Sequence, residues 1–210
     1  MKVCIVGPGI QPIPPTGWGA VEILIHDTRI ELEALGHDVL VVNTPDRQEI
    51  IQQINRFDPE FVHIQYDSFT DVVPHLNCKN VALSSHYGYL EQPNRWAQDG
   101  YPQIADNLCN STADIFAASP GIASIYEGIG IDASRIHIVP NGVNSNKFSF
   151  SESCENPSLS IYLAKVEPRK RQKNFQTVDG LRFAGRCIDS GFDQSNSNYL
   201  GEWSKDQLYK

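Results

Sequence analysis

The chain lacks several patterns that would assign it quickly to a class of proteins. No apolar run approaches the ~20 residues that a membrane-spanning helix needs. Met1 and Lys2 lead directly into an apolar, core-like segment, so we expect no signal peptide. Positive charge is scarce, because 17 Lys and Arg residues stand against 25 Asp and Glu residues, which gives a net charge of −8. A general nucleic-acid-binding protein needs clustered positive charge, so this balance argues against that class.

Metal-binding and disulfide patterns are missing as well. The five cysteines are scattered and odd in number, and no two of them form a C-x-x-C pair. The six histidines show no metal-ligand spacing. These features are typical of reduced thiols in a cytosolic protein, and we expect a cytoplasmic protein without a metal site. The short basic run at 169–171 leaves peripheral contact with the inner membrane surface open.

The most informative feature that is present is the glycine-containing segment Gly17–Glu22. It follows the apolar run Val3–Val6 and a loop rich in Gly and Pro, and it opens a long amphipathic stretch. A strand, a glycine loop and a helix in this order form an anion site, because glycines admit a ligand close to the backbone and the first helical N–H groups have no internal partners. A tight turn that merely reverses the chain is the alternative interpretation.

The loop departs from the dinucleotide-binding fingerprint. The segment 7–12 begins like G-x-G-x-x-G but has Pro12 where the third glycine belongs. The second apolar run, Val39–Val42, ends in Asn43 rather than in an acidic residue. A nicotinamide-dependent oxidoreductase would need both features, so the sequence argues against that reading.

Short apolar runs alternate with helical spacings along the first two thirds of the chain. This alternation predicts an α/β fold of the Rossmann-like type, a doubly wound parallel sheet covered on both faces. Ligands bind at the carboxyl ends of such strands, where Gly17, Gly19 and His86 would lie. We expect a loop at 87–101, strands at 2–7, 39–43, 61–66, 81–85, 115–118 and 136–139, and helices at 21–35, 46–57, 68–76, 102–112 and 120–128.

A change in composition marks a second unit. Residues 149–158 are rich in Ser, Glu, Asn and Pro and read as a linker between a first domain, 1–148, and a second one, 159–210. The second part offers strands at 159–163 and 181–184, a short one near 199–200, and a helical start at 204–209. Because about fifty residues cannot close a doubly wound domain, we expect this second Rossmann-like domain to be incomplete.

Four segments in order resemble the retaining glycosyltransferases of family 4, which have the GT-B fold. They are Gly17–Glu22, Ser84–His86, Val139–Val143 and Lys165–Lys170. The last two are the more specific pair, since the first of them precedes Phe148 and the second directly follows an apolar strand. The resemblance covers the whole chain, as the first domain of the family and the start of its second domain.

The resemblance implies roles for individual residues. The family places a sugar acceptor mainly on its first domain and a nucleotide-sugar donor on its second. Gly17 and Gly19 would approach the phosphates of the donor, and His86 would contact the transferring sugar. Lys165, which stands where the family usually has Arg, and Lys170 would neutralise the diphosphate leaving group, as fixed cations do for developing negative charge. Lysine keeps the charge but lacks the bidentate fork of arginine.

The resemblance also implies a metal-independent transfer of a sugar to a glycan, lipid or small-molecule acceptor. The sequence has no Asp-x-Asp, and the nucleotide-sugar is a substrate, so we expect no cofactor. Asn141 and Gly142 most simply predict a tight turn, and a hinge near the cleft is implied by the resemblance alone.

Other readings of the same residues stay open. His86 fits a satisfied structural histidine, the two lysines fit solvated surface charges, and the aromatic residues Tyr87, Tyr89, Trp96 and Tyr101 fit either a stacking surface for a ligand or a cover for the sheet edge. The family carries two glutamates eight positions apart late in its second domain, whereas Glu202 is the only glutamate after Glu167. We therefore expect a truncated enzyme. The alternative is a non-catalytic remnant that binds a sugar or a protein partner, with self-association through the unfinished second domain.

Overall fold

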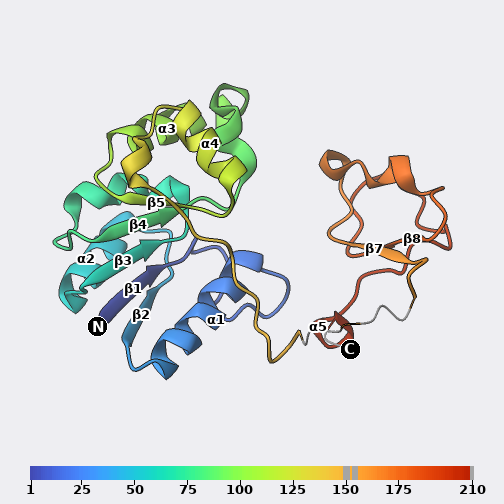
Figure 1. Cartoon of the computed structure of the whole chain (residues 1–210), viewed down its shortest axis with the longest axis horizontal. Helices are drawn as coiled ribbons and strands as arrows, with labels where there is room; N and C mark the ends of the chain where they lie inside the picture. The colour runs from blue at the N-terminus through green and yellow to red at the C-terminus, as the bar shows by residue number, and fades with distance from the viewer. Residues whose placement is uncertain (149–151, 153–155, 209–210) are drawn as a thin grey trace. The chain divides into compact units, whose positions relative to one another are not determined.

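The computed structural model describes residues 1–148, 152 and 156–208. The chain forms two compact units, Met1–Val143 and Asn144–Lys210 (Figure 1). The first unit therefore ends at Val143, whereas the sequence places its end at 148. Most of the predicted linker, 149–151 and 153–155, lies outside the described residues.

The first unit is built on a six-stranded, fully parallel sheet with the strand order β2-β1-β3-β4-β5-β6. Because β1 pairs with β2 on one side and β3 on the other, the chain reverses its direction of travel across the sheet at β1. The carboxyl ends of β1 and β3 therefore flank the topological switch point, where ligands of open α/β sheets bind. The strands are β1 (Lys2–Val6), β2 (Asp38–Val42), β3 (Phe61–Ile64), β4 (Val81–Ser84), β5 (Asp114–Ala117) and β6 (Ile136–Ile138).

Four α-helices of the first unit follow the predicted spans closely, and their ends have the expected causes. Asp46 accepts hydrogen bonds from the N–H groups of residues 48 and 49, and Ser119 accepts one from residue 122. Gly36, with φ of 84°, follows the first helix in the left-handed conformation that favours glycine. The helices are α1 (Ala20–Ala34), α2 (Arg47–Phe57), α3 (Tyr101–Asn110) and α4 (Pro120–Gly128).

The 3₁₀ segments were not distinguished in the sequence. The short helix expected at 68–76 is the 3₁₀ helix η1 (Asp67–His75), and it contains Pro74. The expected loop at 87–101 is largely helical, with η2 (Gly88–Glu91) and η3 (Pro93–Asp99). A further turn, η4 (Ala133–Arg135), precedes β6.

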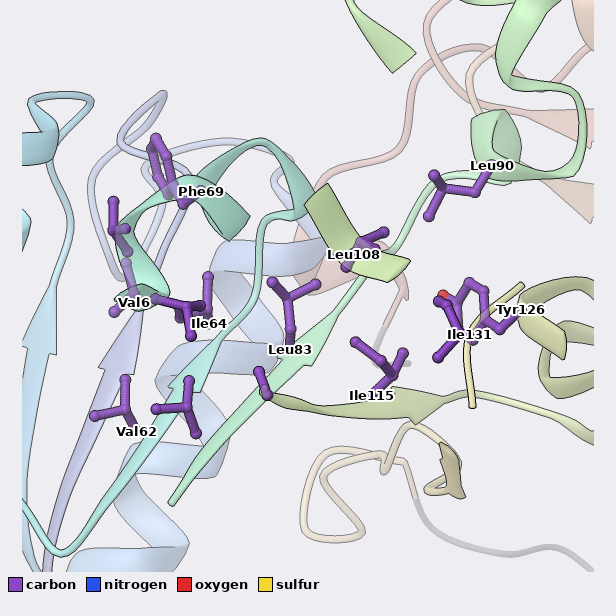
Figure 2. Packing of buried hydrophobic residues seen from close by; sticks show 14 of the residues in the cluster. Val6, Val62, Ile64, Phe69, Leu83, Leu90, Leu108, Ile115, Tyr126 and Ile131 are labelled. Carbon is purple, nitrogen blue, oxygen red and sulfur yellow. The ribbon is translucent and has the colours of Figure 1, made fainter. Parts of the chain in front are cut away.

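Successive side chains of the strands point to opposite faces of the sheet and form a hydrophobic layer on each face. Val3 and Ile5 of β1 pack with Val21 and Ile25 of α1 on one face. The next residues along the same strand belong to the larger layer on the other face, part of which is seen in Figure 2. That layer includes Val6, Val62, Ile64, Phe69, Leu83, Leu90, Leu108, Ile115, Tyr126 and Ile131. The doubly covered sheet predicted from the sequence is thus confirmed.

The second unit holds a two-stranded parallel sheet of β7 (Ser160–Leu163) and β8 (Leu181–Ala184). Tyr199 adds a parallel bridge beside Phe183, and a small core joins Val166, Phe183 and Phe192. The connection between the strands is made by η5 (Pro168–Lys170) and η6 (Gln172–Phe175), and α5 (Lys205–Leu208) follows later. None of the described helices is long and apolar enough to cross a membrane.

Candidate functional site

His86 follows the carboxyl end of β4, and residues beyond the end of β3 hold it in place. Its Nε2 atom lies 3.1 Å from Gln65 Oε1. One residue earlier, the Ser85 hydroxyl donates to Asp67 Oδ2 at 2.5 Å. Gln65 and Asp67 are 2% and 0% exposed. Two hydrogen bonds between side chains therefore join the residues after β3 to the residues after β4, at the edge of the sheet where ligands of this fold class bind.

A third hydrogen bond between side chains lies within β3 and β4 themselves. His63 Nε2 is 2.9 Å from the Ser84 hydroxyl. Burial, aided by the nearby His86, lowers the pKa of His63 from 6.5 to about 4. His63 therefore stays uncharged at neutral pH, and it packs edge-on against Phe116 of β5.

His86 is also an uncharged imidazole at neutral pH, because burial lowers its pKa below the usual value. With Gln65 Oε1 as the acceptor, Nε2 carries the hydrogen and Nδ1 keeps its lone pair. The side chain is only partly buried. A partly exposed, neutral imidazole in this state can accept a hydrogen bond from a ligand hydroxyl.

The carboxyl group of Asp67 is fully buried. Burial raises its pKa, and the hydrogen bond from Ser85 opposes that effect. Its Oδ1 atom is buried without a hydrogen-bond partner. Burial and the proximity of Asp67 in turn raise the pKa of Tyr101 and bring that of Tyr126 to about 12. A ligand cannot contact this carboxyl group directly, so Asp67 influences the site only by holding the Ser85 side chain in place.

The glycine loop is fixed at its base by the side chain of Asn43. Its Oδ1 accepts from the Gly9 N–H at 2.9 Å, and its Nδ2 donates to the Gln11 carbonyl at 2.8 Å. Both ends of the amide are therefore used within the protein. The position that holds an acidic ribose ligand in nicotinamide-dependent enzymes serves here to shape the loop.

The glycine loop ends in an N-terminus without a side-chain cap, since Gly19 is the N-cap residue of α1. A Cβ atom at Gly17 would meet no atom within 4 Å, so the backbone there is open. A Cβ atom at Gly19 would lie 2.6 Å from Glu22 Oε2, so the carboxylate folds back over this glycine. A donor phosphate at Gly17 and Gly19 stays a prediction.

The aromatic residues that follow His86 pack mainly on one another. Tyr87 and Tyr89 stack with ring centroids 5.5 Å apart, and Tyr89 also contacts Trp96 at 4.6 Å and Tyr101 at 4.9 Å. Tyr101 is buried, whereas Tyr87 is 38% exposed. The cluster thus covers the sheet edge, and Tyr87 is the ring that it offers to solvent.

In the second unit, the loop after β7 that carries Lys165 and Lys170 is held from within by Gln172. This fully buried amide donates to the Lys165 carbonyl at 3.0 Å and accepts from the Glu167 N–H at 3.1 Å. Arg171 closes the loop with φ of 56°. The basic residues are therefore presented by a defined turn.

Glu167 partly neutralises this loop. Its Oε1 atom lies 2.7 Å from Arg169 Nη2 and 3.7 Å from Lys170 Nζ. Lys165 is exposed, and no ion pair of its ammonium group is seen in the described part of the chain. Of the two lysines predicted to face a diphosphate, only Lys165 is thus without a competing carboxylate.

Comparisons with known proteins agree with this architecture. Residues 45–147 match the family model described as Glycosyltransferase Family 4. AviGT4, a glycosyltransferase involved in Avilamycin A biosynthesis, is 15% identical with a TM-score of 0.63, over 99% of this chain and 65% of that one. The sucrose-phosphate synthase from Thermosynechococcus elongatus is 13% identical with a TM-score of 0.67, over 99% and 72%. Anabaena Alr3699/HepE, in complex with UDP and glucose, is 12% identical with a TM-score of 0.62, over 99% and 71%.

The first unit is a Rossmann-like GT-B N-terminal domain. No curated protein matches the chain. The family model matches slightly less than half of the chain, and the solved structures show that the chain shares their fold. The chain spans slightly less than two thirds of the length of AviGT4.

The GT-B N-terminal domain brings Gly17, Gly19 and His86 to one edge of its sheet, whereas Lys165 and Lys170 belong to the other compact unit. Sequence reasoning missed three polar residues of this edge, Glu22, Gln65 and Asp67. A usable signal existed for the last two, because Gln65 lies at the end of the strand predicted at 61–66 and Asp67 directly follows it, and the carboxyl end of this strand shares the edge with His86. Across the residues that the structure describes, no group of three or more His, Cys, Asp or Glu side chains is arranged to hold a metal ion.

The tight turn expected at Asn141 and Gly142 is not formed. Residues 139–144 run without a turn, and the turn comes later, at 145–147. Gly142 lacks the positive φ that a two-residue Asn-Gly turn requires. Among the described residues, no strand returns to pair with β6 after this point. The GT-B N-terminal domain ends one residue later, at Val143, and a hinge here stays a prediction.

Proposed function

We propose that this chain is a glycosyltransferase that moves a hexosyl group from a nucleotide-sugar to a glycan, lipid or small-molecule acceptor with retention. The observation that carries the proposal is the neutral His86, held by Gln65 at the carboxyl end of β4. This position lies on the edge of the sheet that serves ligand binding in open α/β folds. The structural neighbour Alr3699/HepE was solved with UDP and glucose, which supports a nucleotide-sugar as the donor.

In the proposed reaction, the bond between the anomeric carbon and the diphosphate oxygen breaks, and the acceptor oxygen forms the new glycosidic bond. Negative charge develops on the departing diphosphate, and fixed cations stabilise it. Lys165 and Lys170 are the candidates for this role, with Lys170 sharing Glu167. His86 would accept a hydrogen bond from a hydroxyl of the transferring sugar and so orient it. The absence of an Asp-x-Asp sequence favours a metal-independent version of this chemistry.

The test is release of UDP from UDP-glucose by the full 210-residue chain, with GDP- and ADP-sugars assayed in parallel. We expect His86→Ala to lower the rate by roughly 10²-fold or more, as loss of a group that acts in the transition state does. His75→Ala is the matched control, since this histidine is exposed on the same domain. Equal rates for the His86 variant and the wild type would remove the histidine from the mechanism, and no turnover of any nucleotide-sugar would overturn the proposal.

A non-catalytic role is the second candidate. It is favoured by the second unit, where Ile161 and Leu163 of β7 are 50% and 44% exposed and Lys170 is engaged by Glu167. An exposed apolar strand favours self-association or capture of a partner. Sedimentation analysis together with the turnover assay separates the two candidate functions, because a monomer with measurable sugar transfer excludes the non-catalytic role. As part of the main proposal we place the protein in the cytoplasm, with peripheral contact at the inner membrane surface through residues 169–171.

A further inference from the structure

The strand β2 lies at an outer edge of the six-stranded sheet, and its outer side pairs with no strand among the described residues (Figure 1). Its hydrogen bonds to β1 determine which main-chain groups face outward. The Val42 carbonyl accepts from the Gly7 N–H, and the even-numbered residues of β2 face β1 in the same way. The N–H and C=O groups of Val39 and Val41 therefore point away from the sheet, where another strand can pair with them.

This edge has little protection against the addition of a strand. Proteins usually protect exposed edge strands with charged residues, prolines or bulges. The register of β2 with β1 is regular along the whole strand, and Asp38 is the only charged residue of β2. The four other residues are apolar, and only Val42 of these is fully buried. Leu35, which ends the preceding helix, is 74% exposed. The edge can therefore accept a further strand.

An open groove of about 410 Å³ lies between this edge and α2, lined by Leu40, Gln53, Arg56 and Phe57. Arg56 is exposed, and its guanidinium group makes no hydrogen bond or ion pair within the part of the chain that the structure describes. Glu49 is also exposed, and its carboxylate accepts from Gln53 Nε2 at 2.9 Å. Glu49 and Arg56 lie seven residues apart, so they share one face of α2. This face is negative toward the N-terminus of the helix and positive toward its C-terminus.

The edge and the face of α2 are complementary to a second copy of themselves. When two β2 strands pair in antiparallel fashion about a two-fold axis through Leu40, Val39 of each copy lies opposite Val41 of the other. Each of these pairs exchanges two hydrogen bonds. The two Leu40 side chains then meet at the axis, on the side of the groove. Because α2 runs against the direction of β2, the same axis brings Glu49 of each copy toward Arg56 of the other.

We propose that two copies of this chain associate through antiparallel pairing of their β2 strands, with reciprocal ion pairs between Glu49 and Arg56. The two parallel sheets then join into one continuous sheet. Two strands separate β2 from β4, so the edge of the sheet that carries His86 stays open to its ligand. This association does not depend on the proposed sugar transfer, and it uses a different strand from self-association through β7 of the second unit.

Sedimentation velocity of the full 210-residue chain over a series of concentrations tests the strand pairing. The decisive variant is Val41→Pro, because proline at this position removes an outward N–H group but no hydrogen bond to β1. Val41→Thr is the matched control, since it keeps the N–H group and the branched shape of the side chain. We expect the wild type and Val41→Thr to form a concentration-dependent dimer and Val41→Pro to stay monomeric. Circular dichroism of each variant verifies the fold.

Charge exchange on α2 gives a second test, which changes only exposed side chains. Arg56→Glu and Glu49→Arg each place like charges across the axis twice, so each variant alone should dimerise roughly tenfold more weakly than the wild type. An equimolar mixture of these two variants has opposite charges in both pairs and should form a heterodimer with near wild-type affinity. Lys79→Glu, at an exposed residue outside β2 and α2, is the control for the change in net charge.

Three results would each overturn the proposed dimer. They are a wild type that stays monomeric at high micromolar concentration, a dimer that persists in folded Val41→Pro, and a variant mixture that associates no better than Arg56→Glu alone. Persistence in Val41→Pro would place the contact on another surface, such as β7. UDP-glucose turnover in the same preparations keeps the two proposals apart, because a β2-dependent dimer without turnover refutes only the enzyme, and turnover by a monomer refutes only the dimer.

Discussion

The partly buried His63 should make the stability of the first unit depend on pH below neutrality. Its imidazole is held by the Ser84 hydroxyl and packs on Phe116, with a pKa of about 4 against a usual 6.5. The unfolded chain therefore binds a proton between these values that the folded chain does not. A base with a lowered folded pKa contributes stability that is present above its unfolded pKa and is lost as the pH falls toward the folded pKa.

The size of this effect follows from proton linkage. Between pKa values of 6.5 and about 4, lowering the pH from about 7 to about 5 should remove about 2 kcal/mol of unfolding free energy, with a limit of about 3 kcal/mol at still lower pH. His63→Gln keeps a partner for Ser84 but cannot be protonated. The substitution loses ring contacts and lowers stability by a constant amount, yet it removes the pH-dependent part.

Urea unfolding followed by circular dichroism at the helical band measures this quantity. The signal reports mainly on the first unit, which holds four of the five described α-helices. His86 titrates in the same direction, so the decisive quantity is the difference between wild type and His63→Gln at each pH. That difference should shrink by about 2 kcal/mol from about pH 7 to about pH 5. Curves that stay parallel over this range would refute the argument.

Two further predictions concern the second unit. Glu167→Gln removes the carboxylate that pairs with Arg169 and Lys170, so it should tighten pyrophosphate binding by roughly tenfold in calorimetry at low salt, and added salt should weaken this effect. Asp179→Asn, at an exposed residue, is the control. Unchanged pyrophosphate affinity in Glu167→Gln would show that these cations do not bind a diphosphate. Phe183→Ala leaves a cavity in the centre of the small core and should lower the unfolding free energy of the second unit by about 3–5 kcal/mol. Hydrogen exchange should then show loss of amide protection in β7 and β8 but not in β1–β6. Ile161→Ala, at an exposed residue, should leave both sheets protected.

Hydrophobic periodicity was sufficient to predict the sheet and its helices. The strands of the first unit are short apolar runs, and the residues that end α1 and begin α4 are Gly36 and Ser119, as expected from their chemistry. The 3₁₀ segments between 67 and 99 could not be separated from loops or α-helices, because a turn of three residues leaves no period long enough to recognise.

The candidate site was predicted only in part, for a physical reason. His86 stood out because it ends an apolar run, but Gln65 and Asp67 gain their meaning from the pairing of β3 with β4, which the sequence does not state. The fit of Glu22 over Gly19 depends on how the first turn of α1 is entered. The turn expected at Asn141 is not formed, because an Asn-Gly pair permits a tight turn without requiring one, and β6 is followed here by an extended segment.

The three bonds between β3 and β4 explain why both histidines of this edge are uncharged. Burial lowers the pKa of both imidazoles, and the nearby His86 lowers that of His63 further. Each bond satisfies one buried side chain, that of Ser84, Asp67 or Gln65, so breaking the bond leaves a buried polar group without its partner. The edge is therefore held in one arrangement by the same burial that lowers the two pKa values. Burial disfavours a charge on either imidazole, so the fold favours the neutral state of His86 that its proposed role requires.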